Sequence, residues 1–330
     1  MREFGYQRVF DVPGAVALLG ADPDARCLGG GTNLVDLMKA GVERPAQLID
    51  VRELPLGRIE AVEGGGLRIG ATVTNSELAA HPEVRRHYPA LAQAVLSGAS
   101  GQLRNMATVG GNLLQRTRCG YFTDSTKPCN KRVPGSGCPA IEGEHHNHAI
   151  LGASAHCVAV HPSDMGVALA AFDAVVRYET TDGPGELPLT EFYLPVGDTP
   201  HLETALPPGA LITGITLPPA PVAAHSRYRK VRERASYAFA IGSIAAALEV
   251  QDGVVREVRL AFGAVAPRPW RAREAERVLT GGPADAAAFA AAADAELAAA
   301  ETLPHNGYKV TLMRNLVVAM LTELTEEAAR

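Results

Sequence analysis

The sequence predicts an α+β protein built from two or three lobes. Its 330 residues exceed what one compact core ordinarily contains, so we expect more than one core. Segments with strand character alternate with segments that carry helix signals, and a Pro-rich stretch at 218–222 is the candidate domain boundary. Residues 113–157 differ, because four cysteines and several Gly and Pro leave little periodicity there. That segment predicts a long irregular loop.

The first 60 residues predict a strand–helix–strand lobe. Pro13 opens a short helix in VPGAVALLG, ARCLGGG is a small strand that runs into glycines, and AQLIDV is a second strand. The next lobe begins with a strand that ends at Thr74. Thr74 or Asn75 is the candidate N-cap of the helix that follows, and a further helix is expected at YPALAQAVLSGAS.

Beyond the irregular loop, VALAAFDAVVRYETTDGPGELPL predicts a helix, a strand, a turn at Asp182-Gly183 and another strand. ALITGITLPP is a strand that ends in the Pro-rich hinge. From about 225 onward, the strands AFAIGSIAAALEVQ and VVREVRLAFGAV precede an Ala-rich helix at 284–301 and a last helix from Lys309.

Composition and charge narrow the function classes. Apolar residues make up 47% of the chain and charged residues 20%, a mix typical of a folded globular protein. The net charge of −5 gives no overall electrostatic reason to bind nucleic acid. Because the chain has no apolar run of about 18 residues and no signal-peptide pattern at its N-terminus, we expect no membrane span and no export signal of its own. The expected location is the cytoplasm, or the periplasm by co-export with a partner.

Cys27 to Leu34 (CLGGGTNL) predicts a glycine loop after a strand. Three consecutive glycines let a backbone approach a ligand closely, and successive N–H groups in such a turn form an anion-binding concavity. The segment lacks the Lys of a nucleotide-hydrolase phosphate loop, and Leu34 stands where the last Gly of the dinucleotide fingerprint belongs. A pyrophosphate could bind here by a different arrangement. The alternative for this loop alone is an ordinary glycine-rich turn.

A second glycine segment, Ala107 to Asn112 (ATVGGN), repeats this combination of small, hydroxyl and amide residues, just after the helix end Ser97 to Ser100. Two such segments could close on one extended ligand from opposite sides. Neither is accompanied by an acid–base pair or a nucleophile, so no catalytic side chain is expected. This pattern suits electron transfer, in which a bound cofactor carries the chemistry.

Four cysteines, Cys119, Cys129, Cys138 and Cys157, are separated by 9, 8 and 18 residues. No C-x-x-C pair occurs, so zinc ribbons and ferredoxin runs do not fit, whereas four thiolates are what a 4Fe–4S cluster needs. A zinc site and plain buried thiols are the alternatives. Cys27 has no partner nearby in sequence and is expected to be a buried apolar residue. The same loop carries positive charge that would suit an anionic cluster, in Arg116, Arg118, Lys127, Lys131 and Arg132. It also carries histidines that we expect around the ligands or in solvent: His145, His146, His148, His156 and His161.

The glycine segments, in their order and spacing and followed by H-P-S-D at 161–164, resemble the FAD-binding subunits of the xanthine dehydrogenase and molybdenum hydroxylase family. The cysteine loop resembles the branch of bacterial, periplasmic-type aldehyde oxidoreductases, whose FAD subunit carries a 4Fe–4S cluster. The resemblance implies a two-lobed FAD-binding domain of the PCMH (vanillyl-alcohol-oxidase-like) type at 1–222, with lobes 1–60 and 61–222 and the cluster insertion at 113–160. A smaller α+β domain of the CO-dehydrogenase-flavoprotein type would follow at 223–330, with a three-stranded sheet and helices.

The resemblance also implies site residues. The first loop would hold the FAD pyrophosphate, with Thr108 and Gly111 on the flavin side, and Asp164 and Lys230 would contact the FAD. For Asp164 the alternative is a helix N-cap, and for Lys230 an ordinary surface charge. The full set of expected FAD-binding residues is Cys27, Leu28, Gly29, Gly30, Gly31, Thr32, Asn33, Leu34, Thr74, Thr108, Gly111, Asn112, Asp164, Ile212 and Lys230. The expected cluster ligands are Cys119, Cys129, Cys138 and Cys157.

By the same resemblance, this chain would be the electron-transfer subunit of a heterotrimer. A large molybdenum-cofactor subunit would oxidise an aldehyde, and a small 2Fe–2S subunit would pass the electrons to the FAD here. The external acceptor would be ferredoxin, a quinone, dioxygen or NAD. Alternatives are the flavin subunit of an enzyme like hydroxybenzoyl-CoA reductase or xanthine dehydrogenase, a self-sufficient flavin enzyme, and a zinc-binding structural protein.

Overall fold

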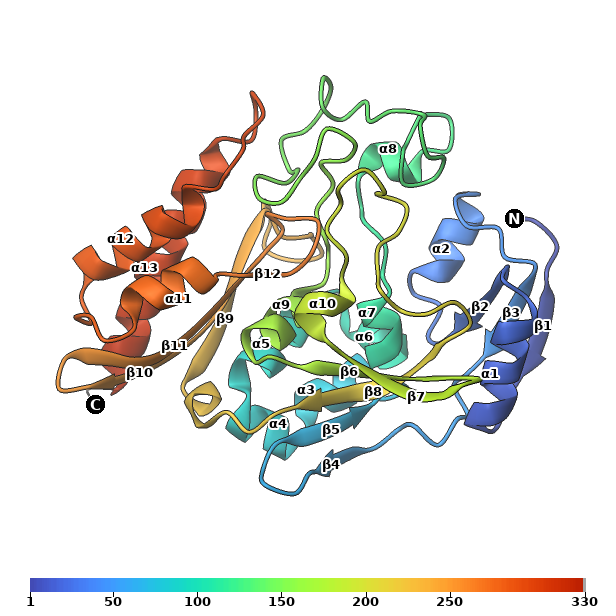
Figure 1. Ribbon diagram of the computed structural model, residues 1–330, viewed down its shortest axis with the longest axis horizontal. Helices are drawn as coiled ribbons and strands as arrows, with labels where there is room; N and C mark the ends of the chain where they lie inside the picture. The colour runs from blue at the N-terminus through green and yellow to red at the C-terminus, as the bar shows by residue number, and fades with distance from the viewer. Residues whose placement is uncertain (329–330) are drawn as a thin grey trace.

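The computed structural model describes residues 1–328, and its elements form three regions (Figure 1). A small N-terminal lobe lies at one end, a central lobe carries a five-stranded sheet, and the C-terminal strands and helices lie at the other end. Each region has its own buried apolar cluster. The predicted α+β architecture of several lobes is therefore confirmed. Within these residues, none of the helices combines the length and apolar character that crossing a bilayer requires.

The N-terminal lobe is a parallel sheet in the order β1-β3-β2 with two helices. As predicted, the helix begins beside Pro13, and Asp11 caps it by accepting the N–H of Gly14 at 2.7 Å. The edge strand β2 ends at Leu28, so the glycine loop leaves directly from the sheet and leads into a helix that the sequence pattern did not reveal. The elements are β1 (Gly5–Arg8), α1 (Val12–Ala21), β2 (Ala25–Leu28), α2 (Leu34–Lys39) and β3 (Gln47–Asp50).

The central lobe has an antiparallel sheet in the order β4-β5-β8-β6-β7. The predicted N-cap is Thr74, whose hydroxyl accepts the N–H of Glu77 while the Glu77 carboxylate accepts the N–H of Thr74. Its strands are β4 (Ile59–Ala61), β5 (Leu67–Gly70), β6 (Val175–Thr180), β7 (Gly183–Pro188) and β8 (Leu211–Leu217). Its helices are α3 (Asn75–Ala80), α4 (Pro82–His87), α5 (Pro89–Ser97), α6 (Gly101–Met106), α7 (Val109–Leu113), α9 (Asp164–Ala171) and α10 (Leu189–Phe192).

The C-terminal region corrects one expectation, because its sheet has four strands, β12-β11-β10-β9, rather than three. The fourth, β12, is a two-residue edge strand just after Pro267 and Pro269, and prolines confine such pairing to short edges. The elements are the 3₁₀ turn η1 (Pro221–Ala224), β9 (Ser226–Val231), β10 (Gly242–Gln251), β11 (Val254–Gly263), β12 (Trp270–Arg271), α11 (Arg273–Leu279), α12 (Ala286–Leu297) and α13 (Tyr308–Ala328).

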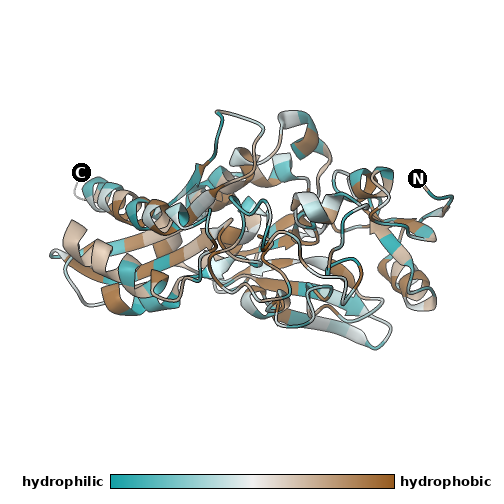
Figure 2. Cartoon of the chain, turned by 90° about the horizontal axis from the view of Figure 1, so that it is seen from above, coloured by the Kyte–Doolittle hydropathy of each residue, from teal (hydrophilic) through white to brown (hydrophobic). Residues whose placement is uncertain are grey.

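The C-terminal sheet is buried on both faces, which explains the composition of β10. Ile244, Ala246 and Leu248 belong to the cluster with α12 and α13, whereas Ala245 and Ala247 belong to the cluster of the central lobe. This alternation follows from the two-residue period of a strand. Small alanines face α5 and α9, so the two lobes share one apolar contact. Many strands carry stretches of hydrophobic residues, drawn in brown in Figure 2.

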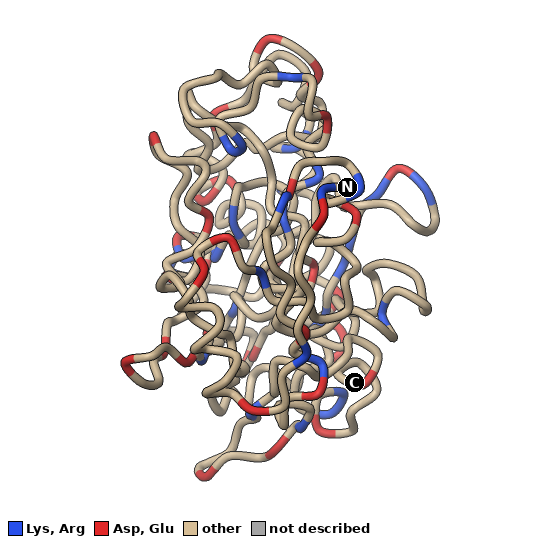
Figure 3. Tube along the Cα trace, turned by 90° about the vertical axis from the view of Figure 1, so that its right-hand side faces the viewer, with Lys and Arg blue, Asp and Glu red and all other residues tan. Residues whose placement is uncertain are grey.

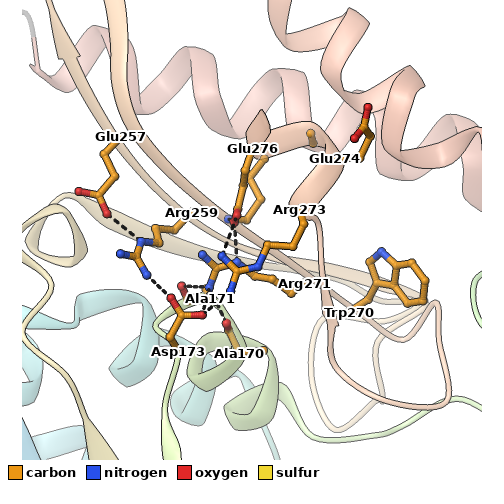
Figure 4. A network of polar contacts seen from close by, with 12 residues as sticks. Ala170, Ala171, Asp173, Glu257, Arg259, Trp270, Arg271, Arg273, Glu274 and Glu276 are labelled. Atoms are coloured by element: carbon orange, nitrogen blue, oxygen red, sulfur yellow. Dashed lines mark hydrogen bonds and ion pairs between the residues drawn. The ribbon is translucent and has the colours of Figure 1, made fainter. Parts of the chain in front are cut away.

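Buried charges also join these lobes (Figure 4). The Arg271 guanidinium donates to the carbonyls of Ala170 and Ala171 at the end of α9, and pairs with Glu276 at 2.6 Å. Asp173, just past the helix, accepts from three arginines: Arg259, Arg271 and Arg273. The Arg271 side chain is only 4% exposed. One buried cation therefore satisfies helix-end carbonyls of one lobe and carboxylates of both.

The cysteine loop runs from the end of α7 to α9 and contains a single helical turn, α8 (Gly120–Thr123). It is irregular, as predicted. It lies between the C-terminal helices and the N-terminal lobe (Figure 1). On one side, Asn306 donates to the carbonyl of Ala149 at 3.1 Å, and Lys309 to that of Asn147 at 2.9 Å. On the other side, Lys131 pairs with Glu203 at 2.6 Å. Positive and negative residues are interspersed along the whole chain (Figure 3).

Candidate functional site

The two glycine segments lie against each other. A Cβ on Gly30 would stand 1.7 Å from the carbonyl oxygen of Met106, and one on Gly29 would stand 2.7 Å from Oγ1 of Thr108. Gly31 has a φ of +72°, in the left-handed region that favours glycine. Thr108 caps α7 by accepting the N–H of Gly111 at 3.2 Å. Glycine is therefore required here for close backbone contact as well as for conformation.

An extended groove passes over this contact. It consists of two adjoining cavities of about 320 and 520 Å³, which share Thr32, Asn33, Gly111 and Gln115 in their walls. The larger cavity continues toward β8 and includes Ile212, and the smaller continues toward β9 and includes Lys230. The shared wall is where the two glycine segments meet. The groove has the length and the polar centre that an extended ligand would use.

Polar groups in this shared wall lack protein partners. Within residues 1–328, none of the backbone N–H groups of residues 29–33 donates to a protein acceptor. The buried Nδ2 of Asn33 has no partner either, although its Oδ1 accepts the N–H of Arg116 at 2.9 Å. Unpaired donors at a buried site are costly unless a ligand supplies acceptors. These donors and the missing Cβ atoms fit a phosphate-bearing ligand such as a dinucleotide.

At the far end of the smaller cavity, Asp164 and Lys230 form a buried ion pair of 2.8 Å. The other carboxylate oxygen of Asp164 accepts from Tyr228 at 2.5 Å, and burial beside this carboxylate raises the pKa of the Tyr228 hydroxyl well above its usual value. The helix N-cap is Ser163, whose Oγ accepts the N–H of Gly166, so the N-cap alternative for Asp164 is wrong. Lys230 is not an ordinary surface charge, since its side chain is 4% exposed.

Most of the predicted binding residues line the groove, and two do not. Those that line the groove are Cys27, Gly29, Gly30, Gly31, Thr32, Asn33, Leu34, Thr108, Gly111, Asn112, Asp164, Ile212 and Lys230. Leu28 and Thr74 do not line it, because Leu28 ends β2 and the Thr74 hydroxyl is engaged in the capping box. Cys27 is half-buried in the larger cavity rather than fully buried, and burial raises the pKa of its thiol to about 12.

Sequence reasoning missed several groove residues. Arg118 was expected near the cysteines as a charge, yet it also lines the smaller cavity beside Tyr237 and Phe239. These two aromatic residues are 63% and 53% exposed, and their position in an otherwise polar segment was a usable signal. His161 lines the larger cavity, where its ring lies 4.5 Å from that of Tyr193. Burial lowers the pKa of His161 to about 4, so its ring is neutral near pH 7.

The four loop cysteines, Cys119, Cys129, Cys138 and Cys157, line one small pocket, and all four are free thiols. The interaction between the Cys138 and Cys157 thiols lowers the pKa of Cys138 to about 6 and raises that of Cys157. Nε2 of His148 lies 3.2 Å from Sγ of Cys119. Within residues 1–328, no three His, Cys, Asp or Glu side chains are grouped closely enough to hold one metal ion.

The basic residues of the loop have other partners than expected. Arg116 pairs with Glu43 and Glu203, and Lys131 pairs with Glu203. Arg132 donates to backbone carbonyls inside the loop, including those of Tyr121 and Asp124. Most of this positive charge therefore fixes the loop's shape and its attachment to the N-terminal and central lobes. Lys131 does lie close enough to Cys157 to favour its thiolate.

Two family descriptions match this chain, one for each of its two parts. The sequence profile of the family described as FAD binding domain in molybdopterin dehydrogenase matches residues 2–220, and that of the CO dehydrogenase flavoprotein C-terminal domain matches residues 226–324. The chain is 49% identical over 330 residues to the aldehyde oxidoreductase FAD-binding subunit PaoB of Escherichia coli strain K12, covering 99% of this chain and 100% of PaoB.

Solved structures show the same fold. Carbon monoxide dehydrogenase from Hydrogenophaga pseudoflava superposes with a TM-score of 0.75 at 27% identity, covering 97% of this chain and 96% of that one. Quinoline 2-oxidoreductase from Pseudomonas putida 86 superposes with a TM-score of 0.77 at 23% identity, covering 100% and 99%.

Proposed function

Because the chain belongs to the FAD-binding subunits of the molybdenum hydroxylases, an oxidoreductase family, we propose that it binds FAD in the groove and a 4Fe–4S cluster in the cysteine pocket. Its function would be electron transfer from the 2Fe–2S centres of a small partner subunit to an external acceptor. A large molybdenum-cofactor subunit would complete the heterotrimer. Aldehyde is the proposed substrate class, since the PaoB relative is named for an aldehyde oxidoreductase.

Different groove residues would bind different parts of FAD. The N–H groups of residues 29–33 and the capped start of α7 would donate to the pyrophosphate. The Asp164–Lys230 pair would fix the polar end of the flavin, and Ile212 would pack against the other half of the ligand. Bound FAD supplies the redox chemistry, and the protein supplies position and electrostatics. Leu28 and Thr74 are left out of this proposal.

The observation that carries the cluster proposal is the shared pocket of the four thiols. They come from positions up to 38 residues apart in an irregular loop, yet they line one space together with Pro128 and Pro139. Four thiolates are the ligand set of a 4Fe–4S cluster. A loop without a periodic apolar pattern gains order from such ligation.

The test is the cofactor content of the purified heterotrimer. Wild type is expected to contain flavin, and iron and acid-labile sulfide in excess of the partner's 2Fe–2S centres by about four atoms each. Cys129→Ser is expected to remove that excess and keep the 2Fe–2S signals. Cys27→Ser, the matched thiol outside the loop, is expected to keep it.

Two results would contradict the proposal. Zinc in place of the excess iron would make the loop a structural metal site, and a chain without flavin would remove the electron-transfer function altogether. An assembly that keeps flavin and loses only the excess iron in Cys129→Ser supports both halves of the proposal.

A further inference from the structure

Arg118 occupies a distinctive place between the two proposed cofactor sites. It immediately precedes Cys119 and lies in the wall of the 320 Å³ part of the groove, together with Thr32, Asn33 and Gly111. It also borders a third cavity of about 580 Å³, which reaches His148. The side chain is therefore placed to act on a ligand in the groove.

The half-buried Arg118 guanidinium lacks the carboxylate partners that Arg116 and Arg271 have. Its Nε is buried without an acceptor, and within residues 1–328 we find no hydrogen bond or ion pair to a protein group for the side chain. Its guanidinium carbon lies 5.1 Å from the centroid of the Phe239 ring. Arg116, two residues earlier, is paired with two carboxylates instead. A buried N–H donor without an acceptor is costly, so an acceptor for Nε of Arg118 is expected from outside the chain.

A second unpaired donor lies in the same cavity. Nδ2 of Asn33 is buried without a partner, and Asn33 and Arg118 share the wall in which the two glycine segments meet. The carboxylate of Asp36 lines this cavity as well and favours the charged form of Arg118 from a distance, but within residues 1–328 no ion pair or hydrogen bond joins the two side chains. Two donors, one of them charged, thus face this space without a protein acceptor at hydrogen-bonding distance among the described residues.

We propose that Arg118 is an FAD-binding residue that donates to an anionic or carbonyl oxygen of the dinucleotide, while Phe239 holds its guanidinium in place. The inference rests on the proposed FAD site and adds a residue that had been assigned to the cysteine loop. Two parts of FAD offer suitable oxygens: the pyrophosphate, and the pyrimidine carbonyl side of the isoalloxazine. A guanidinium favours both, since planar donors suit phosphate and since positive charge stabilises the reduced, more negative ring.

The test uses the full complex after removal and re-addition of FAD. Arg118→Met is expected to weaken FAD binding about tenfold or more, the loss of one charge-assisted hydrogen bond, and Arg118→Lys is expected to weaken it less. Affinity is measured by quenching of flavin fluorescence, with ADP as a competing probe, and the flavin midpoint potential is measured in the same preparations. Thermal midpoints and iron content show that the variants are folded.

The arms of the test separate the two oxygens. A parallel loss of FAD and ADP affinity with an unchanged potential identifies the pyrophosphate. A lower potential and weaker FAD binding with unchanged ADP affinity identifies the isoalloxazine.

Arg85→Met, which changes an exposed arginine of α4 outside the groove, is the control for an indirect effect. FAD affinity and potential that stay at wild-type values in Arg118→Met would overturn the inference, as would an equal loss in Arg85→Met. A wild-type complex that takes up no FAD would instead overturn the proposed function itself. Should Arg118→Met fail to fold, the same measurements are made on Arg118→Lys, for which a smaller loss of FAD affinity supports the inference and wild-type affinity and potential would overturn it.

Discussion

The contact between the two glycine segments yields a quantitative prediction for Gly30→Ala. The added Cβ would lie 1.7 Å from the Met106 carbonyl oxygen, whereas real Cβ atoms stay at least 3.0 Å from such an atom. The two segments must therefore separate by about 1.3 Å. Overpacking of this kind costs about 1–3 kcal/mol. Because both segments line the groove, the same displacement is expected to weaken FAD binding by about tenfold or more.

The assay is a comparison with Gly101→Ala. A Cβ on Gly101 has open space around it, and this residue begins α6 with a backbone conformation that alanine adopts readily. Gly101→Ala is expected to match wild type or gain a few tenths of a kcal/mol. Urea midpoints report stability, and FAD titration followed by flavin fluorescence reports binding. Equal midpoints and equal FAD affinities for the two alanine variants would refute the role given to this contact.

Three further predictions follow from buried polar groups. Burial lowers the pKa of the Lys309 ammonium from 10.5 to about 7. Between these two pH values the unfolded chain binds one more proton than the folded chain, so the free energy of unfolding rises with pH. Lys309→Met is expected to lose this rise, which urea midpoints measured between pH 7 and 10.5 would show. Arg271→Met is expected to cost about 3 kcal/mol in urea unfolding, because it strands a buried carboxylate and two carbonyls, while Arg273→Met, whose side chain is 61% exposed, should cost less than about 1 kcal/mol. Thr74→Ala is expected to cost about 1 kcal/mol through the lost capping box; a change in FAD affinity would contradict its exclusion from the groove.

Local signals account for what the sequence predicted well. Pro13 and Thr74 predict helix starts correctly, because proline and capping side chains favour a helix that begins within three residues of them. The strand β10 carries a long apolar run, which is typical of a strand buried on both faces. The short helices α4 and α6 were missed, because six residues contain too little periodicity to be recognised.

Long-range contacts explain what the sequence could not predict. Lys230 and Asp164 are 66 residues apart, so their ion pair depends on how the C-terminal sheet packs against α5 and α9. The direction in which Arg118 points depends on the aromatic segment near Phe239, which lies more than 100 residues further along the chain. The fourth strand β12 forms only because β11 offers it an edge. Such features are set by tertiary packing and have no local pattern.

The docking of the cysteine loop on the C-terminal helices also sets an order of assembly. The hydrogen bonds from His305 to His145, from Asn306 to Ala149 and from Lys309 to Asn147 span 160, 157 and 162 residues. During synthesis, the thiol-bearing loop emerges from the ribosome long before the partners that hold it. The loop can therefore reach its final shape only when nearly the whole polypeptide has been made, so its maturation is a late, post-translational event. The contact between the two glycine segments can form earlier.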